Sequence, residues 1–204
     1  MANKDVTIIN TGCANISSVK FALQRLGANV TISSDAKEIT KAPRLVLPGV
    51  GSAPAAMQSI AKRNLTEVIQ QLTQPVLGVC LGMQIMVESS EENDLGNTEN
   101  TPCLQLMSGQ VNRMKVGSLR LPHMGWNQVT KSTNSPLFDG LDDGTYFYFV
   151  HSFAVPKYDN TIATCDYGPV FSAAIQHDNF YGVQFHPERS SDAGAQVLRN
   201  FMSL

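Results

Sequence analysis

The chain has 204 residues, enough for one domain with a substantial buried core. Apolar residues make up 43% and charged residues 16% of it, and the formal net charge is −2. The few Lys and Arg residues are scattered rather than gathered into a stripe, which argues against a nucleic-acid-binding protein. No apolar run reaches membrane-spanning length, and the first residues do not resemble a secretory signal peptide. We therefore expect a cytoplasmic protein that forms one domain over residues 1–204.

The four cysteines lack the paired spacing of zinc sites, and no clustered histidine accompanies them. Disulfides are not expected without a secretion signal. Cys13, Cys103 and Cys165 are therefore interpreted as core or loop thiols, and no metal or cofactor is predicted.

The first half of the chain alternates strand and helix patterns. Glycine and proline punctuate these patterns, and the longest helical one is interrupted near residue 63. Such alternation predicts an open, mostly parallel sheet covered by helices on both faces. Strands are expected at 6–10, 29–33, 44–47 and 75–79, and helices at 15–26, 55–72 and 81–88.

The second half has a different pattern. Residues 91–102 are polar and rich in turn formers, which predicts a surface loop, and closely spaced strand patterns follow. Antiparallel strands appended to the parallel sheet are therefore predicted, with a C-terminal helix at 193–201. The strands are expected at 105–111, 126–130, 145–149, 162–165, 173–177 and 180–185.

The strongest functional signal is a cysteine between two glycines, in the segment Gly78-Val79-Cys80-Leu81-Gly82. It follows a predicted buried strand, like the Gly-x-Ser-x-Gly turn of a nucleophile elbow with sulfur in place of oxygen. The glycines allow a sharp strand-to-helix reversal, and a helix N-terminus favours a thiolate at Cys80. The Leu81 N–H would supply half of an oxyanion hole. Taken alone, such a cysteine also fits a small core residue.

A second segment offers a base and a group to orient it. The strand expected at 180–185 runs into His186-Pro187-Glu188, where proline keeps the chain extended. Residues two apart in an extended chain point the same way, so Glu188 can accept the Nδ1 proton of His186 and leave Nε2 for the sulfur. Separately, the two fit a structural histidine and a surface charge. Together with Cys80 they predict a Cys-His-Glu triad.

A third segment, Leu47-Pro48-Gly49-Val50-Gly51-Ser52, also follows a predicted strand. In an open α/β sheet, active sites gather beyond the carboxyl ends of the strands. The two glycines leave the backbone free to present the Val50 N–H as the other half of an oxyanion hole. An ordinary strand-to-helix turn explains the segment equally well.

With these motifs in this order, essentially the whole chain resembles the class I (triad) glutamine amidotransferases. Cys-Leu-Gly-Met-Gln at 80–84 and Gln-Phe-His-Pro-Glu at 184–188 are signatures of the class. Three segments, at 47–51, 122–127 and 149–153, are similar to one branch, the glutaminase subunits of imidazole glycerol phosphate synthase. Other members more often have a Pro-Gly-Gly loop. Residues 10–13 depart from this branch, with Asn-Thr-Gly-Cys where many relatives have Asp-Tyr-Gly.

The resemblance implies a flavodoxin-like fold that hydrolyses glutamine to glutamate and ammonia through a thioester on Cys80, without a cofactor. It implies that His186 and Glu188 complete the triad and that the Val50 and Leu81 backbones hold the oxyanion. Gln84 could instead be a helix-surface residue, and Glu92 one of several loop acids. The positions implied for glutamine binding are Gly49, Gly51, Gln84, Glu92, Ser152 and Phe153.

The resemblance further implies a heterodimer with a (β/α)₈-barrel cyclase subunit. That partner uses the ammonia to convert the nucleotide PRFAR into imidazole glycerol phosphate and AICAR in histidine biosynthesis. In this family partner binding is thought to reorient the oxyanion loop, and Gly49 and Gly51 would ease such a peptide flip. A buried Trp126 and a solvated Arg189 are the alternatives to docking roles. The implied docking residues are Pro122, Met124, Trp126 and Arg189.

Two other functions remain open from the sequence. One is another class I enzyme: an amidotransferase serving a different synthase, or a γ-glutamyl hydrolase that needs no partner. The other is a non-enzymatic scaffold, which the intact Cys80, His186 and Glu188 make the weaker reading. The segment at 122–127 favours the histidine-pathway subunit over another class I enzyme.

Overall fold

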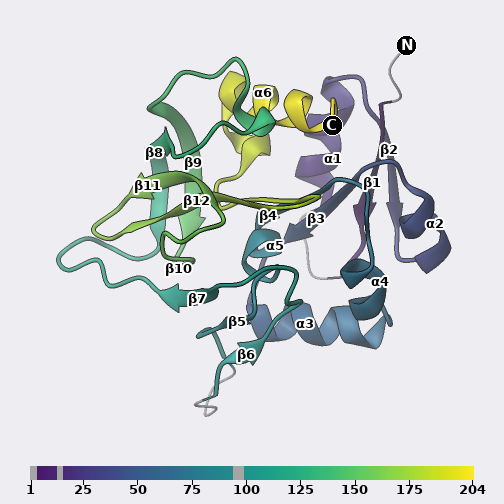
Figure 1. Ribbon diagram of the computed structural model, residues 1–204, viewed down its shortest axis with the longest axis horizontal. Helices are drawn as coiled ribbons and strands as arrows, with labels where there is room; N and C mark the ends of the chain where they lie inside the picture. The colour runs from purple at the N-terminus through teal and green to yellow at the C-terminus, as the bar shows by residue number, and fades with distance from the viewer. Residues whose placement is uncertain (1–3, 13–15, 94–98) are drawn as a thin grey trace.

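In the computed structural model, which describes residues 4–12, 16–93 and 99–204, one large sheet runs through the molecule (Figure 1). Cys13 lies outside the described residues. Nine described strands form this sheet in the order β2-β1-β3-β4-β13-β12-β11-β8-β9. The strands are β1 Asp5–Ile9, β2 Asn29–Ser33, β3 Leu45–Gly49, β4 Val76–Cys80, β8 His123–Lys131, β9 Thr145–His151, β11 Thr161–Asp166, β12 Val170–His177 and β13 Phe180–Val183.

The first five strands in this order are parallel, and the order β2-β1-β3-β4-β13 is that of flavodoxin-like sheets. The other four join them by antiparallel pairing, so the predicted fold class is confirmed. Helices connect successive parallel strands. They are α1 Ile16–Arg25, α2 Ala36–Lys41, α3 Ala53–Lys62, α4 Thr66–Gln70 and α5 Leu81–Gln84, and α6 Ser191–Phe201 follows the last strand.

The parallel strands are buried on both faces because successive side chains enter two separate cores. In β3, Val46 packs with α1 and α6, whereas Leu45 and Leu47 pack with α2, α3 and α4. Figure 1 shows these two groups of helices on opposite sides of the sheet. The near-continuous apolar runs of the first half follow from this double burial.

The helix expected at 81–88 is too long. It ends at Gln84, because the carbonyls of the next residues accept hydrogen bonds from another segment instead of continuing the helix. Leu104 N–H donates to the Ile85 carbonyl at 2.8 Å, and Leu106 N–H donates to the Met86 carbonyl at 2.8 Å. A tertiary contact therefore overrides the helical pattern of this run.

The same contact displaces the strand expected at 105–111. Gln105 has a φ of 55°, which breaks an extended chain, and the observed strand is β7, Gln110–Arg113. Three very short strands, which no pattern indicated, pair around it in a small second sheet of order β10-β7-β5-β6. They are β5 Ser89–Ser90, β6 Thr101–Pro102 and β10 Phe153–Ala154. β6 lies in the expected surface loop.

The edge strand β9 returns to the end of β13, although the two are far apart in the order of the sheet. His186 N–H donates to the Tyr148 carbonyl at 2.9 Å, and Tyr148 N–H donates to Ser190 Oγ at 3.0 Å. Ser190 Oγ in turn donates to the His186 carbonyl at 2.7 Å. The antiparallel half of the sheet thus wraps around to face the carboxyl ends of β3 and β4. Across the described residues, no helix has the length and apolar character that crossing a membrane would require.

Candidate active site

Cys80 is the last residue of β4 and the residue before α5, and its backbone is strained. Its φ of 52° and ψ of −111° lie where non-glycine residues are rare. Such an angle turns the chain sharply enough to leave the side chain above the sheet, as in a nucleophile elbow. Any Cβ at Gly82 would collide with the Leu47 carbonyl oxygen, and one at Gly78 would come within 2.8 Å of the Gly82 carbonyl. The two glycines are therefore required by close packing of the turn.

His186 and Glu188 meet as the sequence predicted. His186 Nδ1 lies 2.9 Å from Glu188 Oε1, and their side chains are 8% and 6% exposed. His186 begins a short 3₁₀ turn, Pro187–Arg189, in which Pro187 occupies the first position. The carboxylate can only accept, so Nδ1 donates the proton and Nε2 is left as the free nitrogen of the ring.

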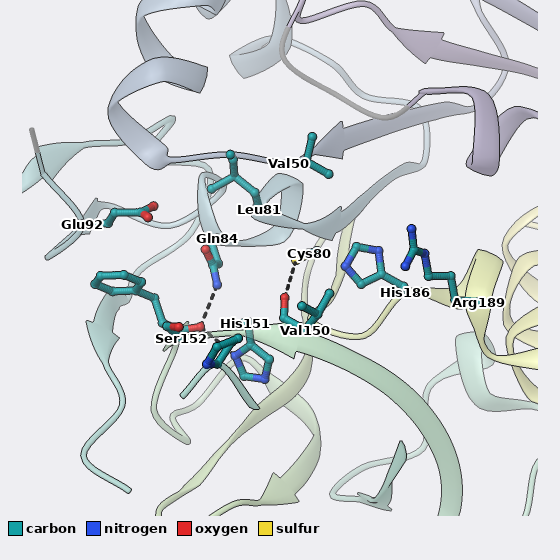
Figure 2. Close-up of a pocket in the computed structure, with 13 residues that line it drawn as sticks. Val50, Cys80, Leu81, Gln84, Glu92, Val150, His151, Ser152, His186 and Arg189 are labelled. Carbon is teal, nitrogen blue, oxygen red and sulfur yellow. Dashed lines mark hydrogen bonds between the residues drawn. The ribbon is translucent and has the colours of Figure 1, made fainter. Parts of the chain in front are cut away.

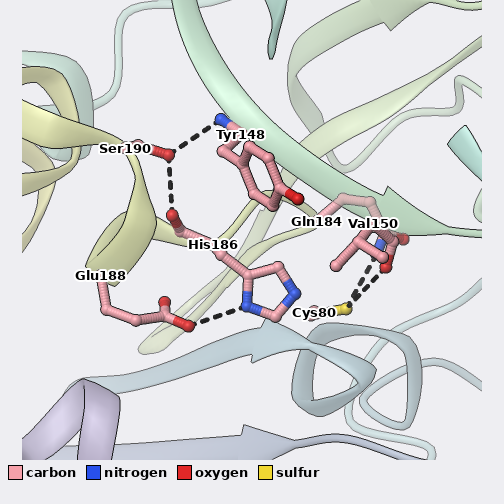
Figure 3. A network of polar contacts seen from close by, with 7 residues as sticks. All are labelled: Cys80, Tyr148, Val150, Gln184, His186, Glu188 and Ser190. Carbon is pink, nitrogen blue, oxygen red and sulfur yellow. Dashed lines mark hydrogen bonds and ion pairs between the residues drawn. The ribbon is translucent and has the colours of Figure 1, made fainter. Parts of the chain in front are cut away.

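The free nitrogen of His186 faces the thiol (Figure 3). Nε2 is buried without a hydrogen-bond partner among the described residues. Burial alone would lower the pKa of His186, but interaction with the Cys80 sulfur and the Glu188 carboxylate outweighs it and raises that pKa above its usual value. The site therefore favours an imidazolium next to the sulfur, as expected of a cysteine–histidine pair in hydrolases.

The sulfur has two further neighbours. Sγ lies 4.0 Å from the Val150 carbonyl, to which the thiol can donate, and Gln184 Nε2 donates to Sγ over 3.6 Å. The two other described cysteines, Cys103 and Cys165, are buried and free. Burial, aided by Glu92 and Asp166 respectively, raises the pKa of each to about 12. Cys103 and Cys165 are therefore core thiols, as predicted.

A pocket of about 360 Å³ opens above Cys80 (Figure 2). Its lining residues come from β4, α5, β9 and β10, from the loops that follow β3, β5 and β13, and from the segment just before β8. Glu188 lies behind His186, outside the pocket wall. Gly49 packs directly on the elbow, where any Cβ would lie 2.5 Å from the Gly82 backbone nitrogen. Of the residues predicted from the sequence, those lining the pocket are Val50, Gly51, Cys80, Leu81, Gln84, Glu92, Pro122, Ser152, Phe153, His186 and Arg189.

Glu92 is drawn into this pocket rather than left among the acids of its loop. Its Oε2 accepts a hydrogen bond of 2.7 Å from Ala53 N–H, at the start of α3. The N-cap residue Ser52 makes no such bond, so Glu92 caps this helix across the fold. Burial raises the pKa of Glu92, and the bond from Ala53 opposes that rise.

Gln84 is likewise turned inward, so the helix-surface alternative is excluded. The side chain is 5% exposed, and its Nε2 donates to the Phe153 carbonyl at 2.8 Å and to Gln184 Oε1 at 2.9 Å. Gln184 itself was not among the predicted site residues. Its signal in the sequence was present, since it opens the class signature at 184–188, but strand alternation alone gives no reason to single it out.

His151 also lines the pocket and was missed. Its Nδ1 lies 2.8 Å from the Phe153 carbonyl, which can only accept, so the proton sits on Nδ1. Its Nε2 then accepts from His123 Nδ1 at 3.0 Å, and His123 Nε2 accepts from Asn127 Nδ2 at 3.3 Å. Burial lowers the pKa of His123 to about 4, and burial together with the neighbouring histidines lowers the pKa of His151 to about 3. The pair is therefore neutral.

The strands β8 and β9 carry an exposed apolar face beside the pocket. Met124 and Trp126 are 62% and 52% exposed, so the buried reading of Trp126 is excluded. Trp126 meets Tyr148 edge to face at 6.1 Å between ring centroids, and Tyr146 is 52% exposed. Pro122 and Arg189 line the pocket beside this face. A surface of this kind suits a partner protein.

No group of three or more His, Cys, Asp or Glu side chains able to hold a metal ion occurs within residues 4–12, 16–93 and 99–204. The site residues instead form a thiol, a base with its carboxylate, and a pocket that presents amide, carboxylate and backbone groups. This set can attack a carbonyl carbon and protonate a leaving group.

Comparison with known proteins agrees with this geometry. Residues 7–204 match the family model for class-I glutamine amidotransferases. The chain is 52% identical to the imidazole glycerol phosphate synthase subunit HisH of Photobacterium profundum, over 99% of this chain and 98% of that protein. It is 54% identical to HisH of Vibrio cholerae, with 98% and 99% covered, and 55% identical to HisH of Pasteurella multocida, with 98% of each covered.

Solved structures with less similar sequences share the fold. A crystal structure of a glutamine amidotransferase superposes with a TM-score of 0.73 at 15% identity, covering 97% of each chain. The structure of PurLQS from Thermotoga maritima gives a TM-score of 0.73 at 17% identity, covering 98% of each chain. HisH is named as a subunit, which implies a partner subunit for this branch. By its family match and its full-length similarity, the chain belongs to the class I glutamine amidotransferases, in the branch of the HisH subunits of imidazole glycerol phosphate synthase.

Proposed function

We propose that this chain is a glutaminase subunit of imidazole glycerol phosphate synthase, acting as one domain over residues 1–204. It hydrolyses glutamine to glutamate and ammonia. The observation that carries the proposal is the thiol of Cys80 on a strained elbow, faced by His186, whose other nitrogen is held at 2.9 Å by Glu188. A core cysteine would need neither the strain nor the oriented base.

The reaction begins when the Cys80 thiolate attacks the side-chain carbonyl carbon of glutamine. The carbonyl π electrons move to oxygen, and the backbone N–H groups of Leu81 and Val50 stabilise that oxyanion. The oxyanion collapses, the C–N bond breaks, and His186 transfers its proton to the leaving nitrogen as ammonia forms. A γ-glutamyl thioester remains on Cys80.

Water completes the cycle. His186, now neutral, takes a proton from a water molecule that attacks the thioester carbonyl. A second tetrahedral species collapses, the C–S bond breaks, and glutamate leaves with Cys80 again a thiolate beside an imidazolium. Glu188 orients the ring throughout and stabilises its positive charge. No redox change occurs, so no oxidant or reductant is required.

The pocket fits the rest of the substrate. Glu92 offers a carboxylate to the α-ammonium group, and Gln84 offers an amide oxygen. The backbone of Ser152 and Phe153 on the opposite wall, together with Gly51, leaves room for an extended amino acid, and Gly49 packs on the elbow below Val50. We assign these residues to glutamine binding.

The ammonia must avoid bulk water, where protonation would remove its nucleophilicity. We assign the face formed by Pro122, Met124, Trp126 and Arg189 to docking of a (β/α)₈-barrel cyclase, in a cytoplasmic heterodimer. That subunit uses the ammonia to convert PRFAR into imidazole glycerol phosphate and AICAR. Exposure of Trp126 supports this role, since aromatic anchors carry much of the energy of interfaces.

Partner binding also regulates the site in this proposal. The Val50 peptide sits between Gly49 and Gly51, and Gly51 has a φ of 97°, so the loop can change conformation at low steric cost. Reorientation of this peptide would complete the oxyanion hole only in the assembled enzyme.

The test is release of glutamate from glutamine by the purified chain, alone and with a cognate cyclase subunit and its nucleotide ligand. Strong stimulation by both is the expected result. High activity of the chain alone, indifferent to the cyclase, would retain the triad but indicate a γ-glutamyl hydrolase. Absence of activity under all conditions would contradict the proposed function.

A further inference from the structure

Gln184 is buried behind the pocket wall, where it contacts both the proposed substrate-binding residue Gln84 and the nucleophile Cys80. It follows β13, where its backbone N–H donates to the Ala173 carbonyl at 2.9 Å, and it is 0% exposed. Its side chain accepts from Gln84 at 2.9 Å and donates to Cys80 Sγ over 3.6 Å, as Figure 3 shows for the bond to sulfur. A single buried amide thus connects two functional groups.

The orientation of both amides is fixed by one carbonyl. The Phe153 oxygen can only accept, and it receives bonds of 2.8 Å from Gln84 Nε2 and 2.8 Å from His151 Nδ1. The nitrogen of Gln84 must therefore point toward Phe153. Its second N–H points to Gln184, which must present Oε1 in reply. The nitrogen of Gln184 is then the end that reaches sulfur.

This arrangement has two consequences, the first for substrate binding and the second for the sulfur. Both N–H groups of Gln84 are engaged, so Oε1 is the amide atom that remains for a ligand, as an acceptor. The α-ammonium group of an amino acid is a donor and suits that atom. Without Gln184, the second N–H of Gln84 would lose its partner, and the amide would be less firmly held.

The other consequence concerns the sulfur. His186 must give its Nε2 proton to the leaving nitrogen, so it does not stabilise the charge on the sulfur throughout the cycle. The N–H of Gln184 is not acidic and remains in place. Hydrogen bonds to an ionised group are stronger than those to a neutral one, so this donor stabilises the negative charge that the sulfur carries when it attacks.

We propose that Gln184 is a positioning residue with two effects: it donates to the Cys80 thiolate and it fixes the amide of Gln84 so that its oxygen faces the substrate. The inference rests on the proposed hydrolysis of glutamine. Gln184 touches neither substrate nor the reacting carbon, and it acts through its two neighbours.

The test uses the full chain and compares Gln184→Met, Gln84→Met and the double variant. Methionine keeps the length of the side chain and removes the hydrogen bonds. The double variant removes both amides together and leaves neither unpaired, so it folds even where a single change is costly. Gln110→Met, at an exposed position of β7, is the matched control.

The first measurement is the rate of Cys80 alkylation by iodoacetamide, followed by mass spectrometry of the Cys80 peptide. This rate reports the thiolate without requiring turnover. We expect a loss of about tenfold in Gln184→Met and in the double variant, the scale of one hydrogen bond to an ionised group. Gln110→Met should stay within about twofold of the wild type.

The second measurement is glutamine hydrolysis with the partner subunit. Gln184→Met should raise KM about fivefold in addition to lowering kcat, since one hydrogen bond from substrate is weakened. In the Gln84→Met background the same substitution should lower kcat with no further rise in KM. If Gln184 only supported the fold, its substitution would raise KM by the same factor in both backgrounds.

The proposal is overturned if folded Gln184→Met, or the double variant, is alkylated as fast as the wild type. It is also overturned if Gln184→Met raises KM equally in both backgrounds. A wild-type chain that is rapidly alkylated at Cys80 but releases no glutamate would contradict the proposed function instead, because alkylation does not depend on it.

Discussion

Two buried histidine sites lie at the pocket, and they are set to opposite charge states. His186, on the segment after β13, has a carboxylate at 2.9 Å, and its pKa is raised. His151, on β9, and His123, on β8, are bonded to each other and to a carbonyl, and their pKa values are lowered. Burial is similar, since His186 and His151, taken as whole residues, are each 6% exposed. The charge of the partner, rather than burial, therefore decides which histidine can transfer a proton.

The largest expected effect tests the sulfur that His186 serves. Cys80→Ala should abolish glutamine hydrolysis, by about 10⁴-fold or more, because the covalent route disappears. Binding to the partner subunit should persist, since the thiol lies inside the pocket and not on the docking face. Turnover is measured as glutamate release and binding by calorimetry. Undiminished turnover would remove Cys80 as the nucleophile.

The comparison itself is tested by replacing one histidine from each site. His186→Ala should lose about 10³-fold or more in kcat, because both proton transfers fail. His123→Phe should keep kcat within about tenfold, since it removes a neutral ring that stacks on Tyr167 at 4.0 Å and not a proton carrier. It should instead cost about 2 kcal/mol of stability through the unpaired His151 nitrogen. Equal losses of kcat would abolish the distinction between the sites.

Removing the charge beside His186 should have a smaller effect. Glu188→Gln keeps an oxygen for Nδ1 but withdraws the negative charge that stabilises the imidazolium. A loss of about a hundredfold in kcat is expected with the partner bound. Asp192→Asn, which changes an acid on α6, is the matched control. Wild-type kcat in Glu188→Gln would show that the carboxylate does not tune the base.

The strands β8 and β9, which carry His123 and His151, also form the exposed apolar face. We expect this face to bind the partner subunit. Trp126→Ala should weaken the complex with the cyclase by about 2 kcal/mol, or about thirtyfold in Kd. Gln128→Ala, also on β8, should change Kd by less than about threefold. The affinities are measured by titration calorimetry. A Kd unaffected by Trp126→Ala would move the docking surface elsewhere.

The last prediction concerns the pH dependence of folding. His123 and His151 take up protons below about pH 6.5 when unfolded, but only near 4 and 3 when folded. The contribution of each to stability is therefore complete above pH 6.5 and is lost as pH falls, toward 4 for His123 and toward 3 for His151. The unfolding free energy should fall by about 1.4 kcal/mol per pH unit for each histidine within this window.

Urea denaturation followed by circular dichroism measures this slope. His123→Phe should reduce it. His186 has the opposite sign: its raised pKa gives stability that is present below pH 6.5 and is lost as pH rises above it. A steep acid slope that survives His123→Phe would exclude the neutral pair as its source.

Much of the fold and most of the pocket could be predicted because their signals are local. The alternation of strand and helix patterns predicted the parallel strands, and the glycines around Cys80 predicted the sharp turn at that residue. His186 and Glu188 are two residues apart, so extended geometry alone brings them together. The residues that could not be found depend on contacts between distant segments. The helix after Cys80 ends at Gln84 because residues 104–106 bond to its continuation.

The buried amide and histidine network was invisible for the same reason. Gln184 meets Gln84 across 100 positions of sequence, and His123 meets His151 across 28. The periodicity of apolar residues along the chain does not predict contacts of this kind. Nor does composition reveal that Glu92 caps a helix 39 residues earlier. Polar groups that pair over long separations are specified by topology, which the sequence pattern describes only coarsely.

The return of β9 to the end of β13 has a consequence for how this protein can change. Tyr148 of β9 shares hydrogen bonds with His186 and Ser190, and it stands opposite Trp126 of β8. One hairpin therefore carries the proposed docking face outward and a wall of the pocket inward. Mutations that adapt the protein to a new partner will disturb catalysis unless they keep the backbone of this hairpin in place. We expect the evolution of its partner specificity and its activity to be coupled, with side chains on the outer face free to vary and the register of β8 and β9 held constant.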